Sequence, residues 1–270
     1  MPFHIAVLLG IVEGLTEYLP VSSTGHLILA GDLLGLRDGD PATASFEIVV
    51  QLGAILAVVA HYRALLAART RGLFTGDAAS HRLLAALLLA FAPAAVLGLL
   101  FRKAIKEHLF GPLPVAGALI TGGIAMIVIE RLRARAHAEG EDGLDRVTPG
   151  RALAIGLGQC LSMWPGTSRS MCTIVAGQLS GLSTATAAEF SFLLALPTLG
   201  AATLYEGYKS RHVLASNVGS ASLAVGLVVS FLVAWGVIAT FLRYLKTRGL
   251  EPFGWYRILL GAVVLWVLAR

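Results

Sequence analysis

Long apolar stretches with charged residues only near their ends recur along the chain. Crossing the hydrocarbon core of a bilayer as a helix takes about 17–25 residues, and six stretches are long enough. They lie at about 46–62, 83–101, 112–129, 189–206, 219–242 and 253–269. Their apolar character is continuous rather than alternating, which is typical of membrane helices and not of barrel strands. We therefore predict an all-α polytopic membrane protein.

Two further apolar regions do not fit a single crossing. Residues 3–36 and 152–182 are too long for one span, and each is interrupted at its middle by a polar run, Pro20 to Gly25 and Pro165 to Ser170. Each half is then too short to cross. Irregular backbone at membrane depth is tolerated only where it is buried in protein or lines a wet cavity. We predict that each region is a re-entrant hairpin of two short helices around a polar turn.

The two hairpins divide the chain into similar halves. Each hairpin is followed by three predicted spans, so we expect one membrane domain, 1–270, made of repeat one at about 1–130, a linker at about 130–151 and repeat two at about 152–270. Because three is odd, the second repeat must be inverted relative to the first. The two polar turns then meet near the midplane, which is where inverted-repeat membrane proteins place their sites.

Composition and charge agree with this class. Hydrophobic residues make up 56% of the chain and charged residues 14%, whereas soluble domains carry about 25% charge. A soluble enzyme, a disordered chain and a disulfide scaffold are thereby excluded. The net charge of +5 is interpreted as positive-inside bias, so no nucleic-acid partner is expected.

Twelve basic residues lie in 63–82, 130–151 and 243–252 against seven on the other side, which predicts that these three loops are cytoplasmic and both termini external.

Paired carboxylates mark the first hairpin as a chemical site. Glu13 and Glu17 are four residues apart and share one helix face. Ionisable groups inside a membrane are costly and usually functional. Two like charges there need a cation between them, which a divalent metal ion (Mg or Ca) or Arg169 would supply. The alternative is that one carboxyl is protonated or that both reach water.

The polar turn of the first hairpin carries hydroxyl groups at a helix start. Ser22, Ser23, Thr24, Gly25 and His26 follow Pro20 and precede an apolar helix at 27–35. Free N–H groups at such a helix start bind phosphate oxygens, although the hydroxyls can also be plain helix caps. Ser23 and His26 are three residues apart, which pairs a candidate nucleophile with a candidate base.

The second turn adds an arginine to the same chemistry. Thr167, Ser168, Arg169 and Ser170 combine hydroxyls with a guanidinium whose planar donors suit phosphate. A structural ion pair between Arg169 and a glutamate of the other hairpin is the alternative. Gln51 can approach the same centre, whereas Gln159 and Gln178 are expected to make hydrogen bonds between helices.

Together these residues indicate phosphoryl transfer from a lipid-borne phosphate, but spacing alone does not separate catalysis from anion transport. The competing hypothesis is therefore a transporter or flippase for lipid phosphate or another anion, since broken helices in inverted repeats suit alternating access. A structural membrane subunit is a weaker alternative, because it does not explain the intramembrane charges. A homodimer is one assembly that the sequence allows.

Four runs resemble the bacterial undecaprenyl-pyrophosphate phosphatases of the bacitracin-resistance type. They are EGLTEYLPVSSTGHLIL from Glu13, FEIVVQLGAILAVV from Phe46, GQCLSMWPGTSRS from Gly158 and AAEFSFLLALP from Ala187. The resemblance implies a bacterial inner-membrane enzyme that hydrolyses undecaprenyl pyrophosphate to undecaprenyl phosphate and so recycles the lipid carrier for peptidoglycan precursors. It also implies a divalent-cation requirement and an active site that opens to the periplasmic side.

The resemblance extends to single positions. Glu13 and Glu17 match the paired acidic motif, Ser22 to His26 the serine-rich loop with Ser23 as nucleophile, and Pro165 to Ser170 the second phosphate loop with Arg169 as the anion clamp. We expect Ser23 to attack the terminal phosphorus with His26 as base, or Ser23 only to bind while water attacks. One departure is Met171, where the family usually has glycine, and we expect its side chain to narrow the approach to phosphate.

Overall fold

The computed structural model describes residues 1–36, 40–109, 111–136 and 140–268. Residues 137–139 of the predicted linker lie outside the described residues, as do Arg37 and Arg270 of the charge comparison. Within the described ranges the secondary structure is helical apart from one isolated bridge between Glu141 and Leu182. The predicted all-α class is confirmed.

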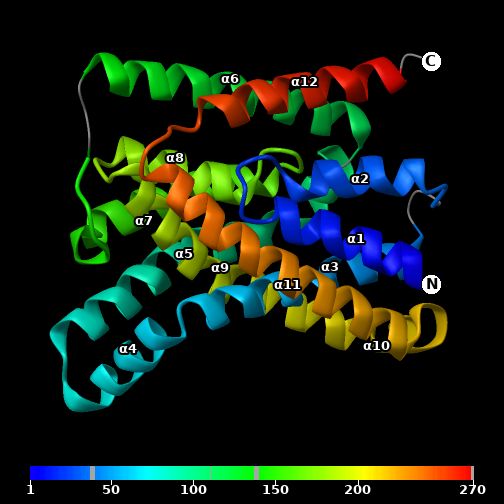
Figure 1. Cartoon of the computed structure of the whole chain (residues 1–270), viewed down its shortest axis with the longest axis horizontal. Helices are drawn as coiled ribbons and strands as arrows, with labels where there is room; N and C mark the ends of the chain where they lie inside the picture. The colour runs from blue at the N-terminus through cyan, green and yellow to red at the C-terminus, as the bar shows by residue number, and fades with distance from the viewer. Residues whose placement is uncertain (37–39, 110, 137–139, 269–270) are drawn as a thin grey trace.

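Both predicted hairpins are present as pairs of short helices. The first consists of α1 (Phe3–Thr16) and α2 (Ser23–Leu33), and the second of α7 (Pro149–Cys160) and α8 (Arg169–Leu179). A 3₁₀ turn, η2 (Leu161–Met163), follows α7. In Figure 1 the α1–α2 pair lies toward one end of the molecule and the α7–α8 pair toward the other, so that their turns point toward the middle.

Long helices follow each hairpin. Their bounds are α3 (Pro41–His61), α5 (Ala78–His108), α6 (Pro112–Arg135), α9 (Thr184–Lys209), α11 (Ser220–Leu245) and α12 (Glu251–Leu268). Most extend several residues past the predicted spans, because apolar stretches mark only the part of a helix that lies in lipid.

Five of the long helices are apolar enough over at least 18 residues to cross a membrane, namely α3, the Ala78–Phe101 part of α5, α6, α9 and α11. The sixth predicted span, 253–269, corresponds to α12 and is not among these five. The chain is therefore a multi-pass membrane protein.

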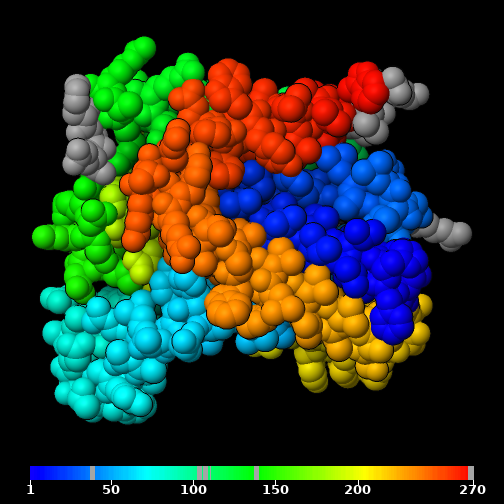
Figure 2. All heavy atoms as spheres, in the orientation of Figure 1, coloured from blue at the N-terminus to red at the C-terminus, as the bar shows by residue number. Residues whose placement is uncertain are grey.

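The segment 63–82 was expected to be a loop, and this expectation is wrong. It contains α4 (Arg63–Thr75), which ends at Gly76 in the left-handed conformation (φ 79°) before Asp77 caps α5. Figure 2 shows α4 and the start of α5 projecting from one end of the molecule. Shorter elements connect the rest: η1 (Leu144–Arg146), α10 (Arg211–Val213) and a π-helical turn, η3 (Leu214–Val218).

Close helix packing builds the body of the molecule. In Figure 1, α6 lies beside α12, while α11 crosses in front of α3 and α9. Glycines allow the backbones to approach: a Cβ placed on Gly123 of α6 would lie 2.6 Å from the carbonyl oxygen of Gly254 in α12. A Cβ on Gly14 of α1 would lie 2.7 Å from the carbonyl oxygen of Ser230 in α11. Small residues at such crossings are the usual basis of helix association in membranes.

The described part of the linker is anchored to the second half. Glu141 donates its backbone N–H to the Gly181 carbonyl (2.9 Å), and its own carbonyl accepts from the Ser183 N–H (3.0 Å). Its carboxylate accepts a hydrogen bond from Arg151 (2.6 Å). These contacts hold the linker against the junction of α8 and α9.

Candidate active site

The two polar turns are built by the same local device. Ser22 and Ser168 have φ values of 73° and 72°, and they are the two non-glycine residues with positive φ in the described ranges. Each caps the helix that follows it, since Ser22 Oγ accepts from the Gly25 N–H and Ser168 Oγ from the Met171 N–H, both at 3.3 Å. Strained backbone of this kind persists only where the surrounding structure fixes it, and it gathers at functional sites.

The strained caps set the first residues of α2 and α8, which meet across the centre. Arg169 begins α8 and donates through Nη2 to Glu17 Oε1 (2.9 Å), while Ser23 begins α2 and donates to Glu17 Oε2 (2.8 Å). Arg169 Nη1 donates to the Ser191 carbonyl in α9 (3.0 Å). The ion pair between the hairpins, which the sequence left open as the alternative role of Arg169, is formed. It connects the candidate nucleophile to the guanidinium through one carboxylate.

Glu13 stands apart from this chain of contacts. It is fully buried, and neither carboxylate oxygen has a hydrogen-bond partner among the described residues. Arg169 therefore serves Glu17 and not both carboxylates. Glu13 retains unused acceptor capacity next to the site.

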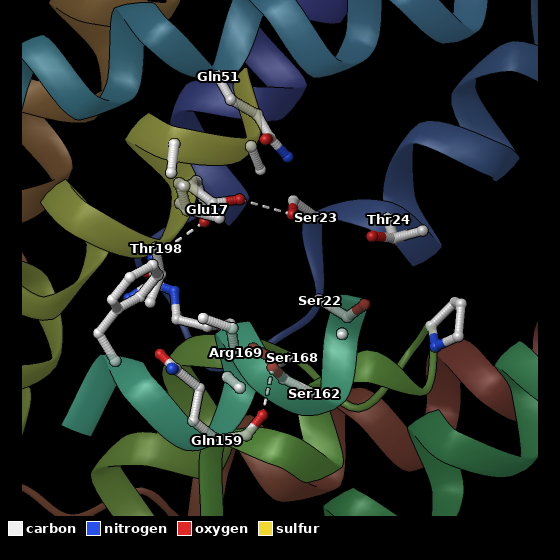
Figure 3. A pocket seen from close by; sticks show the side chains of 18 of the residues that line it. Glu17, Ser22, Ser23, Thr24, Gln51, Gln159, Ser162, Ser168, Arg169 and Thr198 are labelled. Carbon is white, nitrogen blue, oxygen red and sulfur yellow. Dashed lines mark hydrogen bonds and ion pairs between the residues drawn. The ribbon is translucent and has the colours of Figure 1, made fainter. Parts of the chain in front are cut away.

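Glu17, Ser23 and Arg169 line a cavity of about 600 Å³, and Glu13 does not belong to its lining. Of the predicted residues, its lining includes Glu17, Ser22, Ser23, Thr24, Gln51, Ser168 and Arg169. Figure 3 shows Ser22, Ser23 and Thr24 on one side of the cavity, with Glu17, Arg169 and Gln159 on the other. The sequence prediction that the two turns share one pocket is confirmed.

The remaining wall of the cavity is mostly apolar. It comes from two helices that each contain a proline, α5 with Phe91, Ala95 and Leu99 and α9 with Leu199 and Ala202. A site that combines a polar end with an apolar wall suits an amphiphile whose charged head and apolar tail must both be accommodated.

The predicted pairing of Ser23 with His26 requires a hydrogen bond between them, and His26 does not make one. Its Nδ1 lies 2.7 Å from the Ser22 carbonyl oxygen and its Nε2 2.6 Å from the Tyr256 hydroxyl, and the ring stacks on Tyr256. Both nitrogens are engaged, Nδ1 by the carbonyl of Ser22 in the same turn and Nε2 by Tyr256 of α12, which is distant in sequence. The catalytic role of His26 stays a prediction, but this geometry does not make it the partner of Ser23.

Three other predicted binding residues shape the turns and are not part of the cavity lining. Thr167 donates to the carbonyls of Leu161 and Trp164 (2.9 and 2.7 Å). Ser170, fully buried, donates to the Leu19 carbonyl in the other hairpin (2.8 Å). Gly25 donates its backbone N–H to Ser22 Oγ, which caps the start of α2.

We expected the Met171 side chain to narrow the path by which phosphate reaches the second turn, but this side chain does not line the cavity. Met171 is buried and does not belong to the lining. Its side chain instead lies beside Gly122 of α6, where a Cβ on that glycine would be 2.9 Å from the methionine Cε.

Arg257 is a functional candidate that the sequence did not single out. It is fully buried and donates to Gly166 of the second turn (2.9 Å), Pro20 of the first turn (3.2 Å) and Ala118 of α6 (3.1 Å), all through carbonyl oxygens. The available signal was an arginine four residues inside an apolar stretch. One guanidinium thus links both turns.

The two buried glutamines behave differently. Gln178 donates to Glu130 (3.2 Å) and Thr184 (2.8 Å), as predicted for a structural amide. For Gln159 the same prediction is wrong within the described residues: its amide nitrogen and oxygen are buried without a partner, and the residue lines the cavity.

Among the described residues, no three His, Cys, Asp or Glu side chains converge as a metal cluster. The chain does offer two carboxylates, and Glu13 has both oxygens unpartnered. Mg²⁺ is usually held by one or two carboxylates, with waters and substrate phosphates completing its shell. The donor set at Glu13 and Glu17 therefore fits such an ion.

Comparison with known proteins agrees with this chemistry. Residues 6–263 match the family described as bacitracin resistance protein BacA. The undecaprenyl-diphosphatase of Sorangium cellulosum is 62% identical over 97% of this chain and 85% of its own length. Undecaprenyl-diphosphatase 2 of Rhodospirillum rubrum is 50% identical over 96% of this chain and 93% of its own length. The undecaprenyl-diphosphatase of Nitrosomonas europaea is 51% identical over 96% of this chain and 92% of its own length. The chain belongs to the bacitracin resistance protein BacA family.

Proposed function

We propose that this protein is an integral membrane undecaprenyl-diphosphatase, which hydrolyses undecaprenyl pyrophosphate to undecaprenyl phosphate and phosphate. The observation that carries the proposal is the contact chain Ser23–Glu17–Arg169 in the polar part of a cavity whose remaining wall is mostly apolar. The names of the relatives support the same substrate. Hydrolysis recycles the lipid carrier for peptidoglycan synthesis in the bacterial inner membrane and confers resistance to bacitracin.

In the first step, Ser23 Oγ attacks the terminal phosphorus. Its proton passes to Glu17 Oε2, which already accepts the hydroxyl at 2.8 Å, so Glu17 takes the base role that the sequence assigned to His26. Arg169 exchanges its contact with Glu17 for the more highly charged diphosphate, which frees the carboxylate to accept the proton. The bond from the terminal phosphorus to the bridging oxygen breaks, and the electron pair stays with the prenyl phosphate.

The leaving prenyl phosphate takes up the proton that Glu17 received, so the carboxylate is free again. In the second step, water attacks the phosphorus of the phosphoserine and Glu17 removes a proton from that water. The bond between phosphorus and Ser23 Oγ breaks with its electron pair on Oγ, which takes the proton back from Glu17, and inorganic phosphate leaves. Direct attack by water, with Ser23 only binding the substrate, is the nearest variant. Trapping a phosphate ester on Ser23 by acid quench separates the two, because the direct route forms no protein–phosphorus bond.

A divalent cation (Mg or Ca) is part of the proposal. Glu13 and Glu17 are the residues that would hold it, and the chemistry it supplies there is neutralisation of the diphosphate charge. A chelator should then abolish phosphate release, and added Mg²⁺ or Ca²⁺ should restore it. Full activity after exhaustive chelation would reject this part of the proposal alone.

The architecture we propose is an inverted repeat. Its support is an exchange of partners between the halves: α1 packs on α11 and α7 on α5, while α3 pairs with α9 and α6 with α12. Each hairpin thus packs against the second long helix after the opposite hairpin. The matching strained caps at Ser22 and Ser168 add to this correspondence.

The proposed orientation places α4 in the cytoplasm and opens the active site to the periplasm. A membrane-impermeant maleimide should not label Thr75→Cys in intact cells but should label it after permeabilisation, in a background lacking Cys160. Labelling in intact cells would show the opposite orientation.

A homodimer stays a prediction. Light scattering of the detergent-solubilised protein tests it.

The decisive experiment measures phosphate release from undecaprenyl pyrophosphate by purified protein in detergent. Ser23→Ala and Glu17→Gln should each lower the rate by at least about 100-fold, because nucleophile and proton acceptor act as one unit. Ser216→Ala, which removes an exposed hydroxyl from η3, is the matched control and should retain wild-type activity.

The result also separates the enzyme from a transporter. Folded wild-type protein that releases no phosphate, yet moves a prenyl phosphate across vesicles, would overturn the diphosphatase. Near-normal release by Ser23→Ala would keep the diphosphatase and reject Ser23 as nucleophile.

A further inference from the structure

Gln159 has an unusual position for a buried amide. It is 2% exposed, and neither its nitrogen nor its oxygen has a hydrogen-bond partner among the described residues. Leaving a buried polar group unpaired costs free energy. Because Gln159 also lines the cavity, the missing partner is expected to be a bound molecule.

A second unused donor lies on the same side. Arg169 commits both terminal nitrogens, to Ser191 and Glu17, but its buried Nε has no partner within the described part of the chain. Figure 3 shows the Gln159 side chain reaching from the lower wall toward the part of the cavity that Arg169 occupies. Together they offer one neutral and one cationic N–H to an anionic oxygen.

Within this pair, the Gln159 amide lies away from the group that reacts, whereas Arg169 reaches Ser23 through the Glu17 carboxylate. Ser23 stands on the opposite side of the cavity in Figure 3. Gln159 belongs to α7, which packs against α5, the helix that supplies part of the apolar wall. A substrate with its reacting phosphate at Ser23 and its tail along α5 therefore places its inner phosphate at Gln159.

We propose that Gln159, together with Arg169 Nε, binds the phosphate that remains on the prenyl chain. This inference rests on the proposed diphosphatase function. When the bond between the terminal phosphorus and the bridging oxygen breaks, the electron pair goes to that oxygen, and the negative charge of the leaving prenyl phosphate increases. The Gln159 N–H donates to this phosphate and so stabilises the leaving group in the transition state.

Gln159→Met tests the proposal, because methionine keeps the length of the side chain and removes its donor. The value of kcat/KM for undecaprenyl pyrophosphate should fall roughly 10- to 100-fold, the usual effect of losing a hydrogen bond to a charged group. The thermal midpoint should stay the same or rise, since an unpaired buried amide is replaced by an apolar isostere. A fall in midpoint that accompanies the loss of activity would assign Gln159 a structural role instead.

Product inhibition identifies which phosphate is bound. Gln159→Met should raise the inhibition constant of farnesyl phosphate by a similar factor and leave that of inorganic phosphate unchanged. Equal effects on both inhibitors, or an effect on inorganic phosphate alone, would overturn the assignment. If Gln159→Met does not fold, Gln159→Asn, which withdraws the amide by one methylene, must give the same selective change.

Wild-type protein in the same assay separates a failure of this inference from a failure of the proposed function. If it hydrolyses the diphosphate and Gln159→Met does so equally well, this inference fails and the proposed function stands. If wild-type protein releases no phosphate, the proposed function itself fails.

Discussion

Three of the buried residues that carry polar atoms without partners among the described residues belong to the site or adjoin it. Glu13, Gln159 and Arg169 Nε are unpaired, and each is near or in one cavity. A lipid-exposed fold has no water in the membrane core to satisfy such groups. They therefore persist where a ligand pairs with them, or where their energetic cost is offset by function.

Arg257 provides a prediction at the scale of one residue. Arg257→Met should lower the free energy of unfolding by about 2–4 kcal/mol, because three buried carbonyl oxygens lose their donor while the cost of burying a cation is relieved. It should also abolish phosphate release, since the carbonyls belong to both turns and to α6. Urea unfolding and the phosphate assay measure the two effects.

Arg131→Met is the control for that substitution. Arg131 also donates to a partner, Glu251, but it is exposed. Its loss should change stability by less than about 0.5 kcal/mol. A normal phosphate-release rate in Arg257→Met would show that Arg257 does not position the turns.

Glu141 gives a second residue-scale prediction, which concerns pH. The hydrogen bond from Arg151 lowers the pKa of the Glu141 carboxyl below its ordinary value. Its stabilising contribution is therefore complete above the unfolded pKa, about 4.3, and is lost as pH falls through the lower folded value. The thermal midpoint of Glu141→Gln should be below that of the wild type at pH 6, and the difference should shrink as the pH falls below about 4.

Arg151→Gln removes the same hydrogen bond from the other side and should show the same pH dependence. A difference between wild type and Glu141→Gln that persists unchanged to pH 3 would contradict the assignment to the ionised carboxylate.

The sequence indicates the chemistry of the residues better than their contacts. Glu17, Ser23 and Arg169 were predicted because each is polar inside an apolar stretch. Helical spacing predicts His26 as the partner of Ser23, because it places the two residues close together. The structure differs because Tyr256, 230 residues after His26, contacts the histidine ring. No local pattern reveals such a contact, and none reveals that Gln159 lacks one.

At the scale of elements, breakers inside apolar regions predicted both hairpins, because Pro20 and Pro165 leave halves too short to span a membrane. The helix α4 was missed for the opposite reason. Its sequence is polar and carries three arginines, so it lacks the apolar stretch on which the prediction of spans relied. Its end at Gly76 follows from the left-handed conformation there, which glycine adopts without steric cost.

The contact of α6 with α12 gives a prediction for these elements. Gly123→Ala should destabilise the protein by about 1–3 kcal/mol, because the added methyl would lie 2.6 Å from a backbone oxygen of α12 and the helices must separate. Gly117→Ala in the same helix is the matched control, since a Cβ there meets nothing within 4 Å. It should be neutral or stabilising by up to about 1 kcal/mol; equal effects of both variants would exclude the packing explanation.

At the scale of the whole molecule, the halves are joined at the site itself. The Glu17–Arg169 ion pair connects the two hairpins, with side chains 5% and 9% exposed. Breaking one side of a buried pair leaves an uncompensated charge and costs about 3–5 kcal/mol, whereas neutralising both sides costs less. Glu17→Gln and Arg169→Gln should each lower the thermal midpoint markedly, and the double variant should recover part of that loss while remaining without activity. Additive losses in the double variant would show that the pair does not couple the halves, and the cavity would then owe its shape to Arg257 and the helix contacts alone.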